Sequence, residues 1–186
     1  MSAVKNSEQV YIVVSQTGTI LSRILKLITH AEYNHVSLAL NRDLELMYSF
    51  GRLNPYFPFW GGFVVESPNF GTFKRFFNTK VVVLALDIDD ERYGRIKSHI
   101  EKMLTSPKSY RYNYLGLCLA AFKIAHRGHN AFYCSEFVRD VLQKVDVEGI
   151  DSFEDIIKPV DFLSLPGTDC IYQGKLTEYP LMVKGE

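Results

Sequence analysis

The spacing of apolar residues changes several times along the chain, and this change limits the fold more than any other sequence feature. Tyr11 to Val14 is a short β-branched run, typical of a buried strand. After Gly18, apolar residues recur at helical spacing to about His30, which predicts an amphipathic helix. Between His35 and Leu40 the period becomes two, as in a strand with two different faces. This mixed order favours an α+β fold over a doubly wound parallel sheet.

The middle of the chain continues in strands. Asn41-Arg42-Asp43 supplies turn residues, so Leu44 to Phe50 is expected to return as the second strand of a hairpin. Phe63 to Glu66 is a short strand candidate, and the continuous apolar run from Val81 to Leu86 predicts a buried strand.

Helices dominate the part that follows. Asp89 and Asp90 are expected to cap a helix that carries apolar residues as far as Met103. Residues 113–124 are apolar nearly all round, which predicts a central helix, and a further helix is expected from Cys134 to Val145. With no repeat or long linker, the 186 residues are interpreted as one domain, 1–186.

Charge and composition exclude several classes of function. Lys plus Arg and Asp plus Glu both number 21, so no net field draws the chain to nucleic acid. The first ten residues lack a secretory core, and the apolar stretch 115–124 is about half the ~20 residues that span a bilayer. Three cysteines without CxxC spacing indicate neither a disulfide framework nor zinc. We therefore expect a cytoplasmic protein with no transmembrane segment, no nucleic-acid partner, no metal and no cofactor.

Cys134 is the strongest candidate for a nucleophile. The apolar stripe of its helix places Cys134 on the inward face of the first turn. Free backbone amides and the helix dipole favour an anion there, which stabilises a thiolate and lowers the pKa of the thiol. The alternative is that Cys134 is a small buried core residue, as cysteine often is.

A thiolate nucleophile needs a base, and His35 fits best among five histidines. It begins a strand whose same-face neighbours, Ser37 and Ala39, are small enough to leave room for a helix N-terminus. The alternative is a core histidine bonded to backbone.

Two segments together resemble a known family. Tyr33-Asn34-His35-Val36-Ser37-Leu38-Ala39-Leu40, followed by Phe132-Tyr133-Cys134-Ser135-Glu136-Phe137-Val138, is similar to circularly permuted NlpC-type papain-like cysteine hydrolases. The similarity is to the YiiX-like branch, which is related to lecithin:retinol acyltransferase-like proteins. It implies an antiparallel sheet or small barrel packed against helices, with the nucleophile at a helix N-terminus and the histidine earlier in the chain.

The family resemblance also implies a polar residue that orients the imidazole. Aligning the hairpins puts Ser49 there, where the family would have a His, Glu, Asn or Gln. Glu66, at the end of the next strand, is the nearest later carboxylate that could replace it, or it is a solvent-facing strand end.

An oxyanion hole would use the backbone amide of Cys134 and one further donor, for which Tyr11 is the candidate by resemblance. The aromatic loop 55–63, with Trp60, is expected either to wall the substrate cleft or to fold over the core.

These residues predict a cysteine hydrolase acting on an amide or acyl (thio)ester bond through an acyl-enzyme. The resemblance implies a small peptide or acyl substrate, including cell-wall-type peptides. The alternatives are a non-catalytic ligand-binding module of the same fold, or a lipid acyltransferase or thioesterase.

Overall fold

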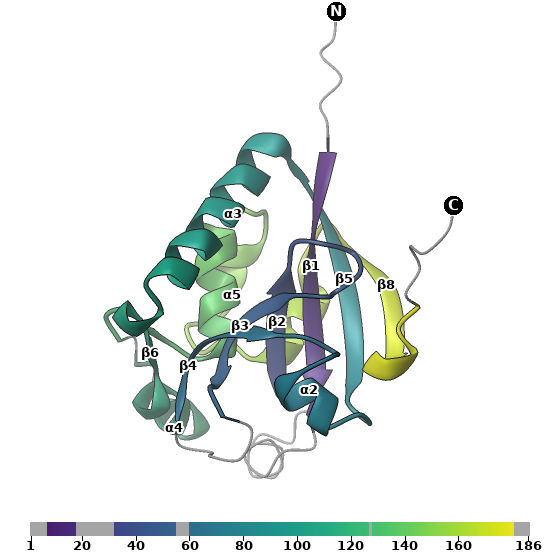
Figure 1. Cartoon of the computed structure of the whole chain (residues 1–186). Coiled ribbons are helices and arrows are strands. Elements are labelled where there is room, and N and C mark those ends of the chain that lie inside the picture. Colours follow the sequence, from purple (N-terminus) through teal and green to yellow (C-terminus); the bar gives the residue numbers. More distant parts are fainter. Residues whose placement is uncertain (1–6, 18–31, 55–59, 127, 181–186) are drawn as a thin grey trace, which may run out of the picture.

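A six-stranded antiparallel sheet forms the centre of the computed structural model, which describes residues 7–17, 32–54, 60–126 and 128–180 (Figure 1). The strand order is β4-β3-β2-β1-β5-β8, and each pair of neighbours runs antiparallel. The strands are β1 (Ser7–Gln16), β2 (His35–Ala39), β3 (Met47–Arg52), β4 (Gly61–Glu66), β5 (Lys80–Asp89) and β8 (Thr168–Lys175). The predicted α+β class and antiparallel sheet are confirmed at this level.

The two faces of the sheet are covered by different numbers and lengths of helix. Figure 1 shows α3 (Asp90–Thr105) and α5 (Cys134–Gln143) together on one face. The short α2 (Gly71–Arg75) contributes Phe73 to the core on the opposite face. α4 (Tyr114–Ala121) lies beside β4, where the Tyr114 hydroxyl approaches Gly61. β6 (Arg111–Tyr112) and β7 (Ala131–Phe132) form a small parallel ribbon, and short 3₁₀ turns occupy Pro107–Ser109, Ile150–Ser152, Pro159–Ser164 and Leu176–Glu178.

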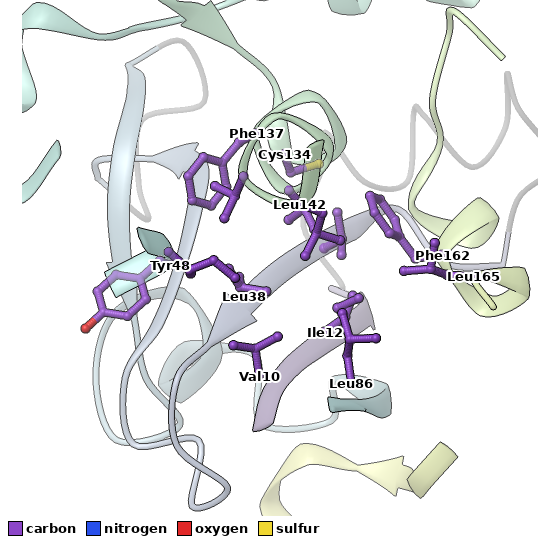
Figure 2. Close-up of a cluster of buried hydrophobic side chains, with 14 of the residues drawn as sticks. Val10, Ile12, Leu38, Tyr48, Leu86, Cys134, Phe137, Leu142, Phe162 and Leu165 are labelled. Atoms are coloured by element: carbon purple, nitrogen blue, oxygen red, sulfur yellow. The ribbon is translucent and has the colours of Figure 1, made fainter. Parts of the chain in front are cut away.

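The alternation along β1 divides the core in two. Val10, Ile12 and Val14 pack into the larger cluster with α3 and α5, whereas Tyr11 and Val13 belong to the smaller cluster on the other face. Figure 2 shows the larger cluster between the sheet and α5. A strand buried on both faces explains why the apolar run in β1 is continuous rather than alternating.

Most of the predicted elements are confirmed, but β1, β4 and β5 are longer than the sequence indicated and β3 begins at Met47 instead of Leu44. β1 and β5 each extend to ten residues. The Asp89 carboxylate accepts a hydrogen bond of 2.9 Å from the backbone N–H of Arg92, so Asp89 is the N-cap of α3. The helix predicted after Gly18 falls outside the described residues.

The prediction of a central helix at 113–124 is wrong. α4 lies at the surface, where Leu115 is 57% exposed, Phe122 is 77% exposed and Cys118 is also exposed. α3 and α5 cover this face of the sheet instead. Each of them has its apolar residues in one stripe, which packs against the sheet. α4 has no such stripe, because its apolar residues point in all directions.

Replacing Phe137 with Ala tests the assignment of the core. Phe137 is fully buried, and its ring centroid lies 5.6 Å from those of both Phe50 and Phe63. The change should lower the free energy of unfolding by about 3–5 kcal/mol, because it leaves a cavity beneath α5. Leu115→Ala on the exposed α4 should change it by about 0.5 kcal/mol or less. Chemical denaturation of the two variants measures both values, and equal losses would contradict the surface position of α4.

Candidate active site

Cys134 is the first residue of α5, and polar groups fix this helix end. The Tyr133 backbone N–H donates to Glu136 Oε2 at 2.9 Å, which satisfies one of the free amides. Asn113 Nδ2 also donates to Glu136 Oε2, at 3.1 Å. Cys134 is 6% exposed and packs with the larger core cluster (Figure 2). The first turn of α5 is therefore held in place from both its polar and its apolar side.

The sulfur of Cys134 bonds to β2 in the part of that strand that does not pair with β3. Their ladder ends at the pair Leu38–Tyr48, although both strands continue beyond it. In the unpaired part, the Ser49 hydroxyl donates to the Val36 carbonyl at 2.7 Å, and the Val36 backbone N–H donates to the Cys134 sulfur. Because the N–H and C=O of one strand residue point the same way, both bonds lie on the β3 side of β2. A side chain from the helix layer thus reaches into the sheet.

His35, at the start of β2, meets Glu66 at the end of β4. His35 Nε2 lies 2.9 Å from Glu66 Oε2 and 3.0 Å from Glu66 Oε1. The Ser37 hydroxyl donates to Glu66 Oε2 at 2.6 Å. The His35 and Glu66 side chains are 14% and 10% exposed, so both are largely shielded from water. With Nε2 directed at Glu66, Nδ1 is the ring nitrogen left to face the thiol.

Gly51 makes room for this contact, because it lies on β3, the strand between β2 and β4. A Cβ at Gly51 would lie 3.2 Å from Val64, 3.6 Å from Glu66 Oε1 and 3.7 Å from His35 Cε1. A larger side chain would therefore compete for the space in which the imidazole and carboxylate meet.

The charged forms of Cys134, His35 and Glu66 stabilise one another. Burial opposes the charged imidazole, but the negative charge of Glu66 and hydrogen bonds to Cys134 and Glu66 raise the pKa of His35 to about 10. Burial likewise opposes the thiolate, but the hydrogen bond and charge of His35, with the Val36 amide, lower the pKa of Cys134. The favoured state is a thiolate–imidazolium pair, which is the reactive form of a catalytic cysteine.

Two residues predicted for the site have other positions. Ser49 is fully buried and its hydroxyl serves the Val36 carbonyl, so the residue bonded to His35 is Glu66, the alternative. Tyr11 pairs with Ala39, four residues along β2 from His35 and therefore about 13 Å away at 3.3 Å per residue. Its hydroxyl donates to Gln9. The choice of Tyr11 as oxyanion donor is wrong, because β1 carries it to the far end of β2.

Tyr112 is a site residue that the sequence reasoning missed. Burial, followed by the negative charges of Cys134, Tyr114 and Glu136, raises the pKa of Tyr112 well above its ordinary value, so its hydroxyl keeps its proton. A Cβ at Gly61 would lie 2.9 Å from the Tyr112 ring, so the ring packs directly on this backbone. The signal in the sequence was the alternation of Tyr110, Tyr112 and Tyr114, which indicates an extended segment.

Trp60 precedes Gly61 and is 59% exposed. Its backbone carbonyl accepts a bond of 2.9 Å from the Leu53 N–H, which closes the loop between β3 and β4. Residues 55–59 of the aromatic loop lie outside the described part. The role of Trp60 in binding substrate stays a prediction.

No protein-family model matches the chain, and a search of curated proteins returns no match. Within the described ranges, no group of three or more His, Cys, Asp or Glu side chains is arranged to hold a metal ion. The same residues include no helix that is both long enough and apolar enough to cross a membrane.

The pair of variants Glu66→Gln and Ser49→Ala separates the two candidates for the orienting residue. Glu66→Gln removes the charge that raises the pKa of His35. The protonated form of His35 becomes less stable, so the pKa of the Cys134 thiol rises. Alkylation of Cys134 by iodoacetamide should then begin at a higher pH than in the unmodified chain. Ser49→Ala should leave that pH unchanged and lower the free energy of unfolding by about 1 kcal/mol through the lost hydrogen bond. The reverse pattern would make Ser49 the orienting residue.

Proposed function

We propose that this chain is a cysteine hydrolase or acyl transferase in which Cys134 is the nucleophile, His35 the acid–base and Glu66 the residue that orients His35. The observation that carries the proposal is the chain of contacts from Cys134 through His35 to Glu66, with pKa directions that favour the thiolate. A nucleophile and a base whose pKa values are shifted by each other at one place are typical of an active site.

The first half of the reaction forms an acyl-enzyme. The Cys134 thiolate attacks the substrate carbonyl carbon, and the carbonyl electron pair moves to oxygen. The backbone N–H of Cys134 at the start of α5 and the Tyr112 hydroxyl are the donors proposed for this oxyanion. When the intermediate collapses, the C–N or C–O/S bond breaks and the His35 imidazolium gives its proton to the leaving group.

In the second half, neutral His35 takes a proton from water or another acceptor, which attacks the thioester carbon. The C–S bond then breaks, and the sulfur leaves as the thiolate. His35 is again protonated and Glu66 again faces a cation, so the resting ion pair is restored.

The arrangement supports a permuted papain-like fold as part of this proposal. The histidine lies on β2 and precedes the cysteine, which begins a helix packed against an antiparallel sheet. By resemblance, the substrate is a small peptide, including cell-wall-type peptides, or an acyl ester or thioester.

A non-catalytic binding module is the alternative from another class. The argument for such a module was that Ser49 occupies the orienting position and is a weak hydrogen-bond partner for an imidazole. The bond between Glu66 and His35 removes that argument, because a carboxylate holds the ring firmly and stabilises its charge.

Trapping the acyl-enzyme tests the proposal. The double variant Cys118→Ser/Cys170→Ser leaves Cys134 as the remaining thiol, because the chain has three cysteines in all. With a p-nitrophenyl ester, this protein should release a burst of p-nitrophenol, and its intact mass should increase by one acyl group. His35→Ala should slow the burst by about 10²–10⁴-fold, which is the usual contribution of general acid–base catalysis.

The control is Cys134→Ala in the same background, which should give neither burst nor mass increase. A protein whose Cys134 forms no acyl adduct, and is alkylated only at the pH of an ordinary thiol of pKa ~8.5, would be the binding module instead.

A further inference from the structure

The surface around α4 lies outside the proposed catalytic residues. Leu115 is 57% exposed, and the two apolar residues that follow the helix, Phe122 and Ile124, are 77% and 52% exposed. Between them Lys123 has a φ of +61°, a left-handed conformation that non-glycine residues seldom adopt. Its backbone N–H bonds to the Ala120 carbonyl at 3.0 Å. The helix end is thus a fixed turn that presents two large apolar side chains to solvent.

The stretch of chain that contains α4 is also one-sided in charge. From residue 102 to residue 135 the chain contains five Lys or Arg and no Asp or Glu, although the whole chain has 21 of each kind. Lys108, Arg111 and Lys123 are exposed, as are His126 and His129. Basic residues beside exposed aliphatic and aromatic ones complement a surface that is anionic outside and apolar beneath.

The position of α4 is fixed relative to the nucleophile. The Asn113 Oδ1 accepts the Gly116 N–H at 2.8 Å and caps α4, while the amide of the same side chain donates to Glu136 in the first turn of α5. Asn113 is 4% exposed, so this link is buried. The exposed apolar residues therefore belong to a helix tied to the start of the helix that carries Cys134.

We propose that α4 and the turn to His126 dock onto an anionic phospholipid bilayer. The turn after α4 would enter the interface, with Phe122 and Ile124 among the acyl chains and the basic side chains at the headgroups. A second copy of the chain fits this surface poorly, because pairing would bring two positive faces together. If the proposed function is right, on which this step rests, the docking presents lipid acyl groups to Cys134.

Vesicle co-sedimentation tests the docking. The full chain should sediment with phosphatidylcholine vesicles that contain about one third phosphatidylserine, and much less with phosphatidylcholine alone. Phe122→Ser/Ile124→Ser should reduce binding to the anionic vesicles by about tenfold or more. Lys108→Gln/Lys123→Asn should also reduce it and weaken its dependence on salt, and Asn suits the left-handed position of residue 123.

Leu46→Ser is the matched control, since Leu46 is 46% exposed and precedes β3 at the end of the sheet opposite His35. It should bind vesicles as the unmodified chain does, and thermal unfolding of every variant checks that it folds. Absence of co-sedimentation, or equal loss in Leu46→Ser, would overturn the docking. So would a dimer, or RNA binding, that the Phe122→Ser/Ile124→Ser change abolishes in place of vesicle binding.

The experiment distinguishes a failure of the docking from a failure of the proposed function. Cys134→Ala should still bind the anionic vesicles, because the sulfur takes no part in docking. Vesicle binding by a chain whose Cys134 forms no acyl adduct would keep the docking and remove the lipid substrate. An acyl adduct without vesicle binding would do the opposite.

Discussion

The site depends on one break in the sheet, where the pairing between β2 and β3 stops. The backbone N–H and C=O of Val36 are therefore free to bond to side chains. Its carbonyl accepts the Ser49 hydroxyl and its N–H donates to the Cys134 sulfur. If the two strands paired to their ends, the N–H and C=O of Val36 would both bond to β3. The Cys134 sulfur would then have no backbone donor at this place. The thiol could then not reach the face that carries His35. The break in pairing is thus what joins the helix layer to the sheet face on which His35 and Glu66 lie.

Burial makes this junction costly unless each group has its partner. Two acidic groups and one imidazole share a space that water barely reaches, with Glu66 10% and His35 14% exposed. An isolated charge in such surroundings would be neutralised, but the imidazolium between two anions stabilises both. The same burial, with the negative charge of Cys134, raises the pKa of Tyr112 and keeps its hydroxyl neutral. The same constraint explains Gly51, because a strand between two partners must leave them room to meet.

The sequence predicted the layers of this fold better than the details of the site. Period-two and continuous apolar runs located the strands, and the apolar stripe of α5 placed Cys134 at the start of a helix, because these signals are local. Choosing between Ser49 and Glu66 required knowing where the β2–β3 ladder ends, which local patterns do not encode. Tyr11 failed for a similar reason: its distance from His35 depends on the β1–β2 register. For α4, apolar composition indicated burial, but only competition with the better-matched α3 and α5 decides which helices cover the sheet.

That competition has a consequence for substrate access. Cys134 is 6% exposed, so a carbonyl must approach the sulfur from the little surface that the sheet and α5 leave open. Tyr112 packs on Gly61 in this neighbourhood, next to the exposed Trp60, and leads through Asn113 into α4. Aromatic residues thus lie on the chain between β4 and α4, and the α4 region carries exposed aliphatic and basic residues. A hydrophilic peptide gains little from such surroundings, whereas an acyl chain with an anionic headgroup meets complementary groups along the whole path. For the function we propose, the exposed position of α4 therefore fits an acyl substrate better than a peptide.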